Sequence, residues 1–466
     1  MLTGAPRGTR DILPDEARAW RQVEAAAREI AGLYGFGEIR TPIFEHTELF
    51  QRGVGEGTDI VQKEMYTFAD RGDRSITLRA EGTAPAARAY VEHSLYAGPQ
   101  PVKLYYLAPI FRYERPQAGR LRQHHQFGIE IFGAAEPAAD VEILALAYHL
   151  FDRLGIRRPR LALNSVGCAD CRGSYREKLL AYYGPRKDKL CPDCRDRYER
   201  NPMRLLDCKR EDCREAAAGA PVIAESLCPE CRAHLDGVVF GLESAGIPHE
   251  LDPFIVRGLD YYNRTAFEFL ADDLGAQKAV GAGGRYDGLV QACGGPSTPG
   301  VGCGIGLERL LLLREKHAAD AAHAASDSAS TPRSKAGSNA GTVDGRSGVS
   351  DGRAGTASPG AAAGEIGREG SLYLAVVGSA ALGTAPALAR ELRDHGTAVE
   401  YDLLGRSLKA QLRYADKKGF RQVVILGDDE LKANLAVVKD LGEGTQRQVP
   451  LASLREHLAS GSKTPV

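Results

Sequence analysis

The spacing of apolar residues predicts the elements in the first third of the chain. Between residues 15 and 34, Trp20, Val23, Ala27 and Ile30 recur at intervals of three and four, which places them on one face of a helix. Further helices are predicted over 81–95 and 140–155, and short strands over 76–79, 102–113, 126–133 and 161–166. Another strand is predicted over 39–44, but Pro42 breaks it, so we expect an edge or interface element there. Short loops rather than helical crossovers join these strands, so we expect an antiparallel sheet.

Further strands are expected before residue 316. They lie at 249–256, 265–270 and 278–282, and a glycine-rich strand at 300–306 runs into a helix that begins near residue 307.

The last part of the chain predicts a second, smaller domain. Beyond residue 371, strands and helices alternate over 372–377, 384–395, 398–403, 408–418 and 422–426. This alternation predicts a small α/β domain over 371–466 with a partly parallel sheet.

Residues 317–370 differ in composition from the segments on either side. They are rich in Ala, Gly and Ser, contain no aromatic residue and offer only Val343, Val349 and Ile366 as larger aliphatic side chains. Such a segment buries too little apolar surface to offset its ordering entropy. We therefore predict a disordered linker between a first domain at 1–316 and the second at 371–466.

Charge and hydropathy limit the class of protein. The 466 residues carry 60 Lys and Arg against 61 Asp and Glu, which excludes a protein that coats nucleic acid without specificity. Binding of RNA would need local basic patches and shape. No apolar run approaches the roughly 18 residues that span a bilayer, and the first twenty residues are too charged for a secretory signal. We expect a cytoplasmic protein in a reducing compartment.

Eight of the ten cysteines fall between residues 167 and 235. They form the pairs Cys168 and Cys171, Cys191 and Cys194, Cys208 and Cys213, and Cys228 and Cys231. Three of the pairs are C-x-x-C, a spacing that allows two thiolates to chelate one ion. Disulfides are not expected in a reducing compartment, so the two interpretations are structural zinc, up to two tetrahedral ions, and reduced structural thiols.

A glycine-rich strand carries the first candidate chemistry. Gly302, Gly304 and Gly306 alternate along it, so one face is bare and a ligand can lie against the backbone. Arg309 follows in the first turn of the next helix, where a guanidinium suits a bidentate grip on phosphate. The alternative is a packing strand followed by a surface arginine.

A hairpin over residues 111–133 is the second candidate. Arg112 at the end of its first strand and Glu130 on its second could face one pocket, across a loop that is dense in Arg and Gln. The alternative is a hairpin with a solvated basic loop.

These features resemble the three signature motifs of class II aminoacyl-tRNA synthetases: Pro42 after a long helix, Phe-Arg-x-Glu at 111–114, and the glycine-alternating strand that leads to Arg309. Five further segments resemble histidyl-tRNA synthetases, namely 7–17, RGLDYYNRTAFEF at 257–269, GAGGRYDGL at 281–289, 406–419 and 423–431. The resemblance covers almost the whole chain except the linker. It implies an α+β fold: an antiparallel catalytic domain with a helical Cys-rich insertion at 167–235, followed by an α/β anticodon-binding domain.

The resemblance also implies a reaction. Histidine would be activated by ATP to histidyl-adenylate and transferred to the 3′ end of histidine tRNA, with no side chain as a covalent nucleophile. Activation needs positioning and cationic stabilisation of the growing charge. Arg112 would bridge the α-phosphate and the histidine carboxylate, Arg257 would lie beside the α-phosphate, and Arg309 would clamp the triphosphate.

The remaining ligand contacts follow from the same resemblance. Mg²⁺ is expected on the β- and γ-phosphates. The other implied ATP-binding residues are Arg120, Gly304, Gly306 and His124, the last standing where class II enzymes stack an aromatic ring on adenine. The implied histidine-binding residues are Glu81, Gly82, Thr83 and Gln126 at the α-amino end, and Glu130 and Tyr262 at the imidazole, with Tyr261 and Tyr286 nearby.

The implied partners are histidine tRNA and a second copy of the chain, with no membrane or DNA partner. Gln117 and Arg122 would meet the acceptor end of tRNA, and Arg406, Lys409 and Arg413 would mark a basic anticodon-binding helix, for which the alternative is a solvated helical face. The homodimer would form through the Pro42 region. Two other functions compete: a non-catalytic regulatory subunit of ATP phosphoribosyltransferase on the same core, and a histidine-sensing module.

Overall fold

The computed structural model describes residues 4–55, 58–116, 119–256, 258–275, 278–329 and 371–460. Gln117, Arg257 and residues 330–370 of the predicted linker lie outside these residues. Helix α10 (Leu307–Ala329) continues beyond residue 317, so the first part of the predicted linker is helical. Alanine, which dominates this part, has the highest helix propensity, and this explains the difference.

An eight-stranded sheet forms the centre of the first domain, and its inner strands pair in antiparallel fashion as predicted. Each edge strand pairs in parallel with its neighbour. In spatial order the strands are β1 (Gly37–Glu38), β5 (Val102–Phe111), β6 (Gln123–Phe132), β11 (Gly300–Gly306), β10 (Ala279–Arg285), β9 (Asn263–Leu270), β7 (Arg160–Ser165) and β8 (Glu250–Leu251).

Two predicted strands are much shorter than expected. Within the 39–44 segment only Phe44 belongs to a strand, as the first residue of β2 (Phe44–His46), and the 249–256 segment keeps only the two residues of β8. Pro42 and Pro253 lack the N–H that a sheet ladder needs. The backbone near Pro42 bonds to a side chain instead, because Nη1 of Arg79 donates to the carbonyl oxygens of Thr41 and Pro42 at 3.0 and 3.3 Å.

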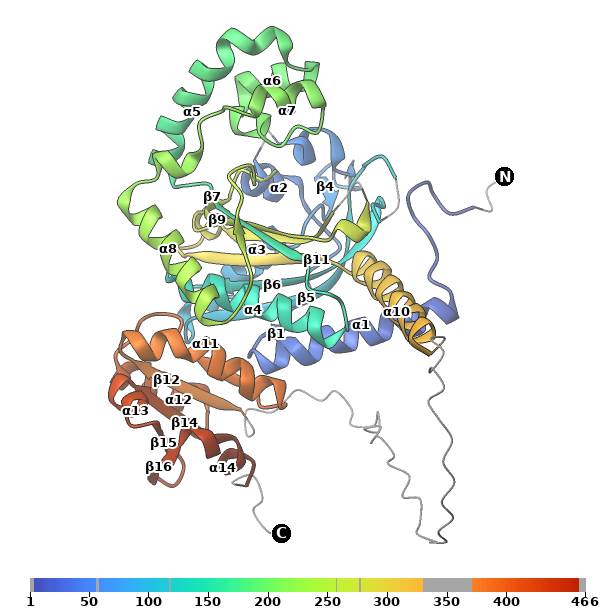
Figure 1. Cartoon of the computed structure of the whole chain (residues 1–466). Helices are drawn as coiled ribbons and strands as arrows, with labels where there is room; N and C mark the ends of the chain where they lie inside the picture. The colour runs from blue at the N-terminus through green and yellow to red at the C-terminus, as the bar shows by residue number, and fades with distance from the viewer. Residues whose placement is uncertain are drawn as a thin grey trace, which may run out of the picture.

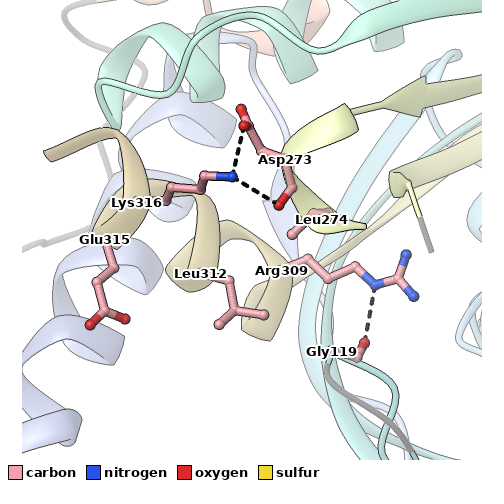
Figure 2. A pocket seen from close by; sticks show the side chains of 7 residues that line it. All are labelled: Gly119, Asp273, Leu274, Arg309, Leu312, Glu315 and Lys316. Atoms are coloured by element: carbon pink, nitrogen blue, oxygen red, sulfur yellow. Dashed lines mark hydrogen bonds and ion pairs between the residues drawn. The ribbon is translucent and has the colours of Figure 1, made fainter. Parts of the chain in front are cut away.

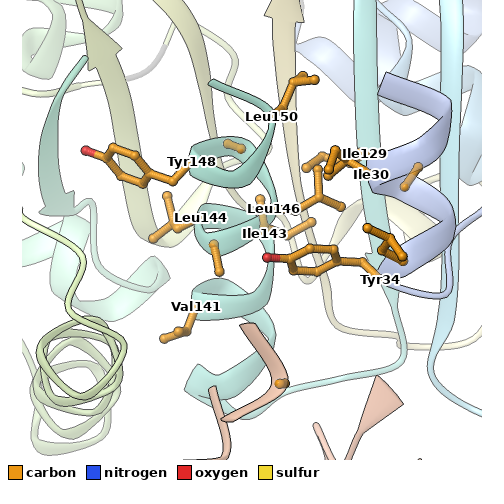
Figure 3. Close-up of a cluster of buried hydrophobic side chains, with 14 of the residues drawn as sticks. Ile30, Tyr34, Ile129, Val141, Ile143, Leu144, Leu146, Tyr148 and Leu150 are labelled. Carbon is orange, nitrogen blue, oxygen red and sulfur yellow. The ribbon is translucent and has the colours of Figure 1, made fainter. Parts of the chain in front are cut away.

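Three helices cover one face of the sheet: α1 (Pro14–Leu33), α4 (Pro137–Arg153) and α10 (Figure 1). The predicted apolar stripe of α1 is confirmed, since Trp20, Val23, Ala27 and Ile30 are all buried. Figure 3 shows side chains of α1 and α4 meeting Ile129 of β6. This layer makes the sheet a rigid base for side chains on its other face.

The other face of the sheet carries shorter elements and the insertion. A three-stranded sheet of β2, β4 (Ser75–Leu78) and β3 (Thr67–Ala69) lies there with α2 (Thr47–Val54), α3 (Thr83–Glu92) and α9 (Leu289–Ala292). The insertion is helical as predicted, and it extends away from the sheet (Figure 1). Its helices are α5 (Ala169–Tyr183), α6 (Pro192–Arg200) and α7 (Glu211–Ala217), and α8 (Pro229–Ser244) returns the chain to the catalytic domain.

The second domain is a five-stranded sheet with helices, and its sheet is partly parallel as predicted. In spatial order its strands are β13 (Val399–Tyr401), β12 (Leu372–Val377), β14 (Gln422–Gly427), β15 (Leu435–Asp440) and β16 (Gln446–Pro450). Its helices are α11 (Ser379–Asp394), α12 (Leu408–Lys418), α13 (Asp428–Lys432) and α14 (Leu454–Ser460). None of the helices in the described ranges is long and apolar enough to cross a membrane.

A buried arginine joins the two domains. Arg393 of α11 is only 2% exposed, and it donates to both carboxylate oxygens of Glu142 in α4 at 3.0 and 2.7 Å. Its guanidinium lies 3.6 Å from the centre of the Tyr34 ring. Nζ of Lys103 donates to the same carboxylate at 3.0 Å. The domains are therefore held together by a charge network that is closed to solvent.

Candidate active site

A buried carboxylate with three hydroxyl donors lies at the centre of the sheet. Glu130 of β6 is 0% exposed. Its Oε1 accepts hydrogen bonds from Thr83 Oγ1 at 2.8 Å and from the Tyr106 hydroxyl at 3.1 Å, and its Oε2 accepts one from the Tyr286 hydroxyl. Burial raises the pKa of Tyr106 and of Tyr286 well above 10, so both phenols keep their protons and act as donors. The carboxylate is thus fixed in one orientation.

The environment of Glu130 favours its protonated form. Burial raises the pKa of its carboxyl to about 8, although the hydroxyls of Tyr286, Thr83 and Tyr106 oppose the shift. The nearby charge of Glu81 adds to the increase. A carboxyl that titrates close to neutral pH can gain or lose a proton when a polar ligand binds beside it.

The pKa of Glu130 has a consequence for stability. The folded protein binds this proton up to about pH 8, whereas the unfolded chain releases it near pH 4.5, so the free energy of unfolding falls as pH rises between these values. Each tenfold difference in proton affinity corresponds to about 1.4 kcal/mol, so the Glu130 contribution should reach a few kcal/mol. Glu130→Gln has no such proton, and urea unfolding should show the variant gaining stability relative to the wild type between pH 5 and 8. Parallel pH profiles for the two proteins would contradict the assignment.

Glu81 lies at the start of helix α3, next to this cluster. Its carboxylate accepts the backbone N–H groups of Thr83 and Ala84, each at 2.7 Å, which satisfies two amides that lack partners within the helix. Burial raises its pKa, while these bonds and the charge of Arg112 lower it. The Tyr261 hydroxyl donates to Glu81 Oε2 at 3.4 Å. Glu81 and Glu130 therefore stand as two acidic groups on either side of Thr83.

Tyr106 is a member of the cluster that the sequence analysis missed. It lies on β5 opposite Gly128 of β6, and a Cβ at Gly128 or at Gly82 would overlap its ring. Glycine at both positions therefore creates the space through which the Tyr106 hydroxyl reaches Glu130. The two glycines were the available signal, but they belong to different elements.

The predicted tyrosines gather around the same two carboxyls. The ring of Tyr261 lies 4.6 Å from that of Tyr262 and 5.7 Å from that of Tyr286, measured between centroids. Tyr262 and Tyr286 are buried. Gln126 lies on β6 beside Gly304, whose Cβ would come 3.4 Å from the Gln126 side chain. The structure thus brings Glu81, Thr83, Glu130 and the three tyrosines into one cluster, and it places Gln126 four residues away from Glu130 on the same strand.

The Glu130 side chain lies against the face of β11 on which alternate residues are glycine. Gly302 pairs with Glu130 across β11 and β6, and a Cβ at Gly302 would overlap the Glu130 carboxylate. Cβ atoms at Gly304 and Gly306 would meet their neighbours only at 3.4 and 3.6 Å. The close approach therefore demands glycine at position 302.

Gly302→Ala should displace the Glu130 side chain without removing it. Over-packing of this kind costs about 1–3 kcal/mol of folding stability. Urea unfolding of the variant and of the wild type measures this effect. The matched control is Gly288→Ala, because nothing lies within 4 Å of its added Cβ. Equal free energies of unfolding in the two variants would show that the close approach of Gly302 and Glu130 is unimportant.

Positively charged side chains lie near Glu81, on the side of Glu81 that faces away from Glu130. Arg112, which follows β5, donates from Nε to the carbonyl of Ala80 at 2.7 Å. Burial, and then the charges of Arg112 and Arg309, lower the pKa of His124 to about 3, so the imidazole is uncharged at neutral pH. Arg120 donates to Glu114, with one contact at 2.6 Å.

Arg309 extends from the first turn of α10 towards the hairpin loop (Figure 2). Its Nε donates to the carbonyl of Gly119 at 3.1 Å, and its Nη1 donates to the carbonyl of Ala279. A cavity of about 340 Å³ opens beside it, and Lys316 and Asp273, which form an ion pair at 3.0 Å, are part of its lining. The structure therefore places Arg309 where a ligand from solvent can reach it.

The residues predicted for tRNA are distributed over two regions. Arg122 lies 3.7 Å from the centre of the Tyr113 ring and donates to the Glu114 carbonyl at 3.1 Å. Lys409 and Arg413 are exposed on one face of α12. Arg406 precedes that helix rather than lying on it, and its Nε donates to Asp402 at 2.6 Å. The expected basic helix thus consists of the later residues only.

Comparison with known proteins agrees with this architecture. A family model described as histidyl-tRNA synthetase matches residues 8–171 and 207–310, and one described as anticodon binding domain matches residues 371–460. The histidine–tRNA ligase of Desulforamulus reducens is 50% identical over 454 residues, which is 97% of this chain and 98% of the relative. That of Desulforudis audaxviator is 50% identical over 458 residues, covering 98% and 99%.

Solved structures give the same result. Apo histidyl-tRNA synthetase of S. aureus is 35% identical, with a TM-score of 0.56 over 98% of this chain and 100% of that chain. A protein of Bacillus halodurans titled ATP phosphoribosyltransferase regulatory subunit/histidyl-tRNA synthetase has a TM-score of 0.51 at 20% identity over 91% of this chain and 98% of that one, which shows a shared fold alone. The full-length similarity at 50% identity establishes that this chain belongs to the histidyl-tRNA synthetase family.

Proposed function

We propose that the protein is a histidine–tRNA ligase. It activates L-histidine with ATP to give histidyl-adenylate and diphosphate, and it then esterifies the 3′ end of histidine tRNA with release of AMP. The observation that supports this proposal is the buried Glu130 carboxylate, which accepts hydrogen bonds from three hydroxyl groups. The positively charged side chain of Arg112 lies on the same side of the sheet.

The cluster suits both ends of histidine. Glu130 accepts an imidazole N–H, Tyr262 contacts the other side of the ring, and Tyr261 and Tyr286 enclose it. A neutral imidazole donates a hydrogen bond from one nitrogen and accepts one at the other. A carboxylate can accept the first bond, and a phenol hydroxyl can donate the second. A site that must hydrogen-bond its ligand rejects isosteres that cannot reciprocate by as much as about 10⁴-fold.

The α-amino end of the ligand meets a second set of groups. Its ammonium is held by the carboxylate of Glu81, the hydroxyl of Thr83 and the amide of Gln126, beside Gly82. This arrangement turns the histidine carboxylate towards Arg112. Two carboxyls at opposite ends of the pocket thus fix both the identity and the direction of the amino acid.

Activation depends on positioning and charge. A carboxylate oxygen of histidine attacks the α-phosphorus of ATP, and the bond to the bridging oxygen of the diphosphate breaks. Arg112 and Arg257 stabilise the charge that grows on the α-phosphate oxygens, and Arg309 and Arg120 hold the departing phosphates. Mg²⁺ enters with the nucleotide on its β- and γ-phosphates.

The adenine end and the bare strand complete the nucleotide site. His124 stacks on adenine as an uncharged ring, which its low pKa supports. Gly304 and Gly306 let the nucleotide lie close to β11. In the second step a ribose hydroxyl attacks the activated carbonyl and AMP leaves, so no side chain forms a covalent bond.

Transfer needs contact with two parts of tRNA. We assign Gln117 and Arg122 to the acceptor end, and Arg406, Lys409 and Arg413 to the anticodon, through attraction between guanidinium or ammonium groups and phosphates. Lys409 and Arg413 are the better supported of the last three, because both are exposed on α12.

The assembly and location follow the family. We propose a cytoplasmic homodimer that forms through the Pro42 region. The apolar side chains of Ile43, Phe44 and Phe68 are 48%, 56% and 48% exposed on the small sheet, which supports an interface there. We also propose structural Zn²⁺ in the Cys-rich insertion.

Histidine-dependent exchange of labelled diphosphate into ATP tests the function. A ligase exchanges label only when histidine is present, whereas a regulatory subunit or a histidine-sensing module gives no turnover. The match of an anticodon binding domain to residues 371–460 disfavours the regulatory subunit. Exchange with another amino acid in place of histidine would contradict the proposed pocket.

A further inference from the structure

The fold combines the four cysteine pairs of the insertion into two compact groups. The neck cluster consists of Cys168, Cys171, Cys228 and Cys231, where the insertion leaves and rejoins the catalytic domain. The tip cluster consists of Cys191, Cys194, Cys208 and Cys213. Within each cluster all four sulfur atoms lie within 4.8 Å of one another, and no two cysteines of the described residues form a disulfide.

These dimensions match a tetrathiolate zinc site. Zn–S bonds of about 2.3 Å in a tetrahedron place the sulfur atoms about 3.8 Å apart. The Cys168 and Cys171 sulfur atoms are 3.5 Å apart, and the other distances need only a small contraction around an ion. A tetrahedral set of four sulfurs is the geometry that Zn²⁺ takes in structural sites.

The backbone around the thiols is also arranged for anionic sulfur. Cys168, Cys191 and Cys228 directly precede helices α5, α6 and α8, where the helix dipole favours negative charge. The backbone N–H of Cys228 points to the Cys171 sulfur at 3.1 Å, and that of Cys191 points to the Cys213 sulfur at 3.3 Å. Donors of this kind orient metal-bound ligands, whereas apolar core thiols need none.

We propose that the insertion holds two Zn²⁺ ions, one in the neck cluster and one in the tip cluster. Each ion has four thiolate ligands and no open position, so both sites are structural. Ligand pairs that are distant in sequence are joined in this way. The neck ion links the first turn of α5 to the first turn of α8, and the tip ion links the first turn of α6 to Cys208 and to Cys213 of α7.

The two ions also position part of the histidine pocket, an inference that rests on the proposed function. One residue beyond Cys171, Arg172 donates from Nη1 to the carbonyl of Tyr262 at 3.1 Å. On α6, beyond Cys194, Arg197 forms an ion pair with Asp59 at 3.1 Å, and the next residue after that helix, Asn201, donates to Asp260 at 3.2 Å. Both metal-anchored helices are thus connected by hydrogen bonds to the segment 260–262, which carries two of the pocket tyrosines.

Metal counting on the purified full chain tests the sites independently of activity. Inductively coupled plasma mass spectrometry should find two zinc ions per chain. Cys171→Ser/Cys231→Ser and Cys194→Ser/Cys213→Ser should each retain one, and the control Cys293→Ser should retain two. Fewer than one zinc in the unaltered chain, or loss of both ions from each double variant, would overturn the proposal.

A measurement on the unaltered chain avoids variants that fail to fold. Stepwise modification with an organomercurial, followed with a zinc indicator, should release one ion for every four reactive thiols of the insertion. Reaction of these thiols with no release of zinc would overturn the sites. This result does not depend on whether the protein charges tRNA.

The positioning role has its own readout. In the tip double variant, amide hydrogen exchange over residues 258–262 should accelerate, and the KM for histidine in diphosphate exchange should rise about tenfold, the effect typical of a lost supporting contact at a metal site, with a smaller change in kcat. Asn201→Ala, which keeps both ions, should reproduce part of the KM increase. Unchanged hydrogen exchange in the tip variant would reject this role.

Discussion

Replacing Arg112 with alanine should lower the rate of histidine-dependent diphosphate exchange by about 10³-fold, the loss expected when one preorganised cation is removed from a phosphoryl-transfer site. The guanidinium is held by the Ala80 carbonyl at 2.7 Å, and its charge lowers the pKa of Glu81 and of His124. It therefore lies between the amino-acid and nucleotide sides of the site. The loss should fall on kcat, because its contact with the α-phosphate strengthens in the transition state.

Steady-state diphosphate exchange with varied histidine and ATP separates the effect on kcat from the effect on KM. The matched control is Arg115→Ala, which removes an exposed arginine from the same loop and should leave exchange within about threefold, as surface substitutions usually do. A thermal melt should show that the Arg112 variant stays folded. An Arg112→Ala enzyme with kcat near that of the wild type would contradict its role.

Replacing Arg393 with methionine should destabilise the protein by about 3–5 kcal/mol, the penalty for leaving one partner of a buried ion pair without the other. Methionine fills similar space, so the loss of stability would come from the missing charge rather than from a cavity. Glu142 would keep its bond from Lys103 but lose both bonds from the guanidinium. The ring of Tyr34 would also lose the cation above it.

The chain has one tryptophan, Trp20, buried in α1, so its fluorescence during urea unfolding reports on the catalytic domain. Arg421→Met is the matched control, since it breaks a pair with Asp440 in which the arginine is exposed, and it should cost less than about 1 kcal/mol. In the triple variant Arg393→Met/Glu142→Leu/Lys103→Met, most of the stability should return, because all three buried charges of the network are removed together. An Arg393 variant as stable as the Arg421 variant would contradict the proposed tie between the domains.

Elements with a local signal could be predicted from the sequence. The apolar stripe of α1, the glycine-rich strand β11 and the alternation of strands and helices after residue 371 are all present as expected. The break at Pro42 was predicted, but the strand around Pro253 was predicted too long because hydropathy outweighed the missing N–H group. Hydrophobic periodicity thus predicted which helices and strands are present more accurately than where each of them begins and ends.

Features that depend on contacts between distant elements could not be predicted. The role of Tyr106 requires space left by Gly82 and Gly128, which lie on other elements. Arg393 and Glu142 are 251 residues apart, and each looks like an ordinary charge on a helix until the two domains pack together. The cysteine pairs were visible as spacings, but their combination into two clusters required the path of the insertion.

Charging of total tRNA with each amino acid in turn tests the central claim most directly. If Glu130 and its hydroxyl donors form a pocket for an imidazole, the protein should attach histidine to tRNA and none of the other amino acids at a comparable rate. Attachment of a different amino acid, or no attachment while histidine still binds, would contradict the account.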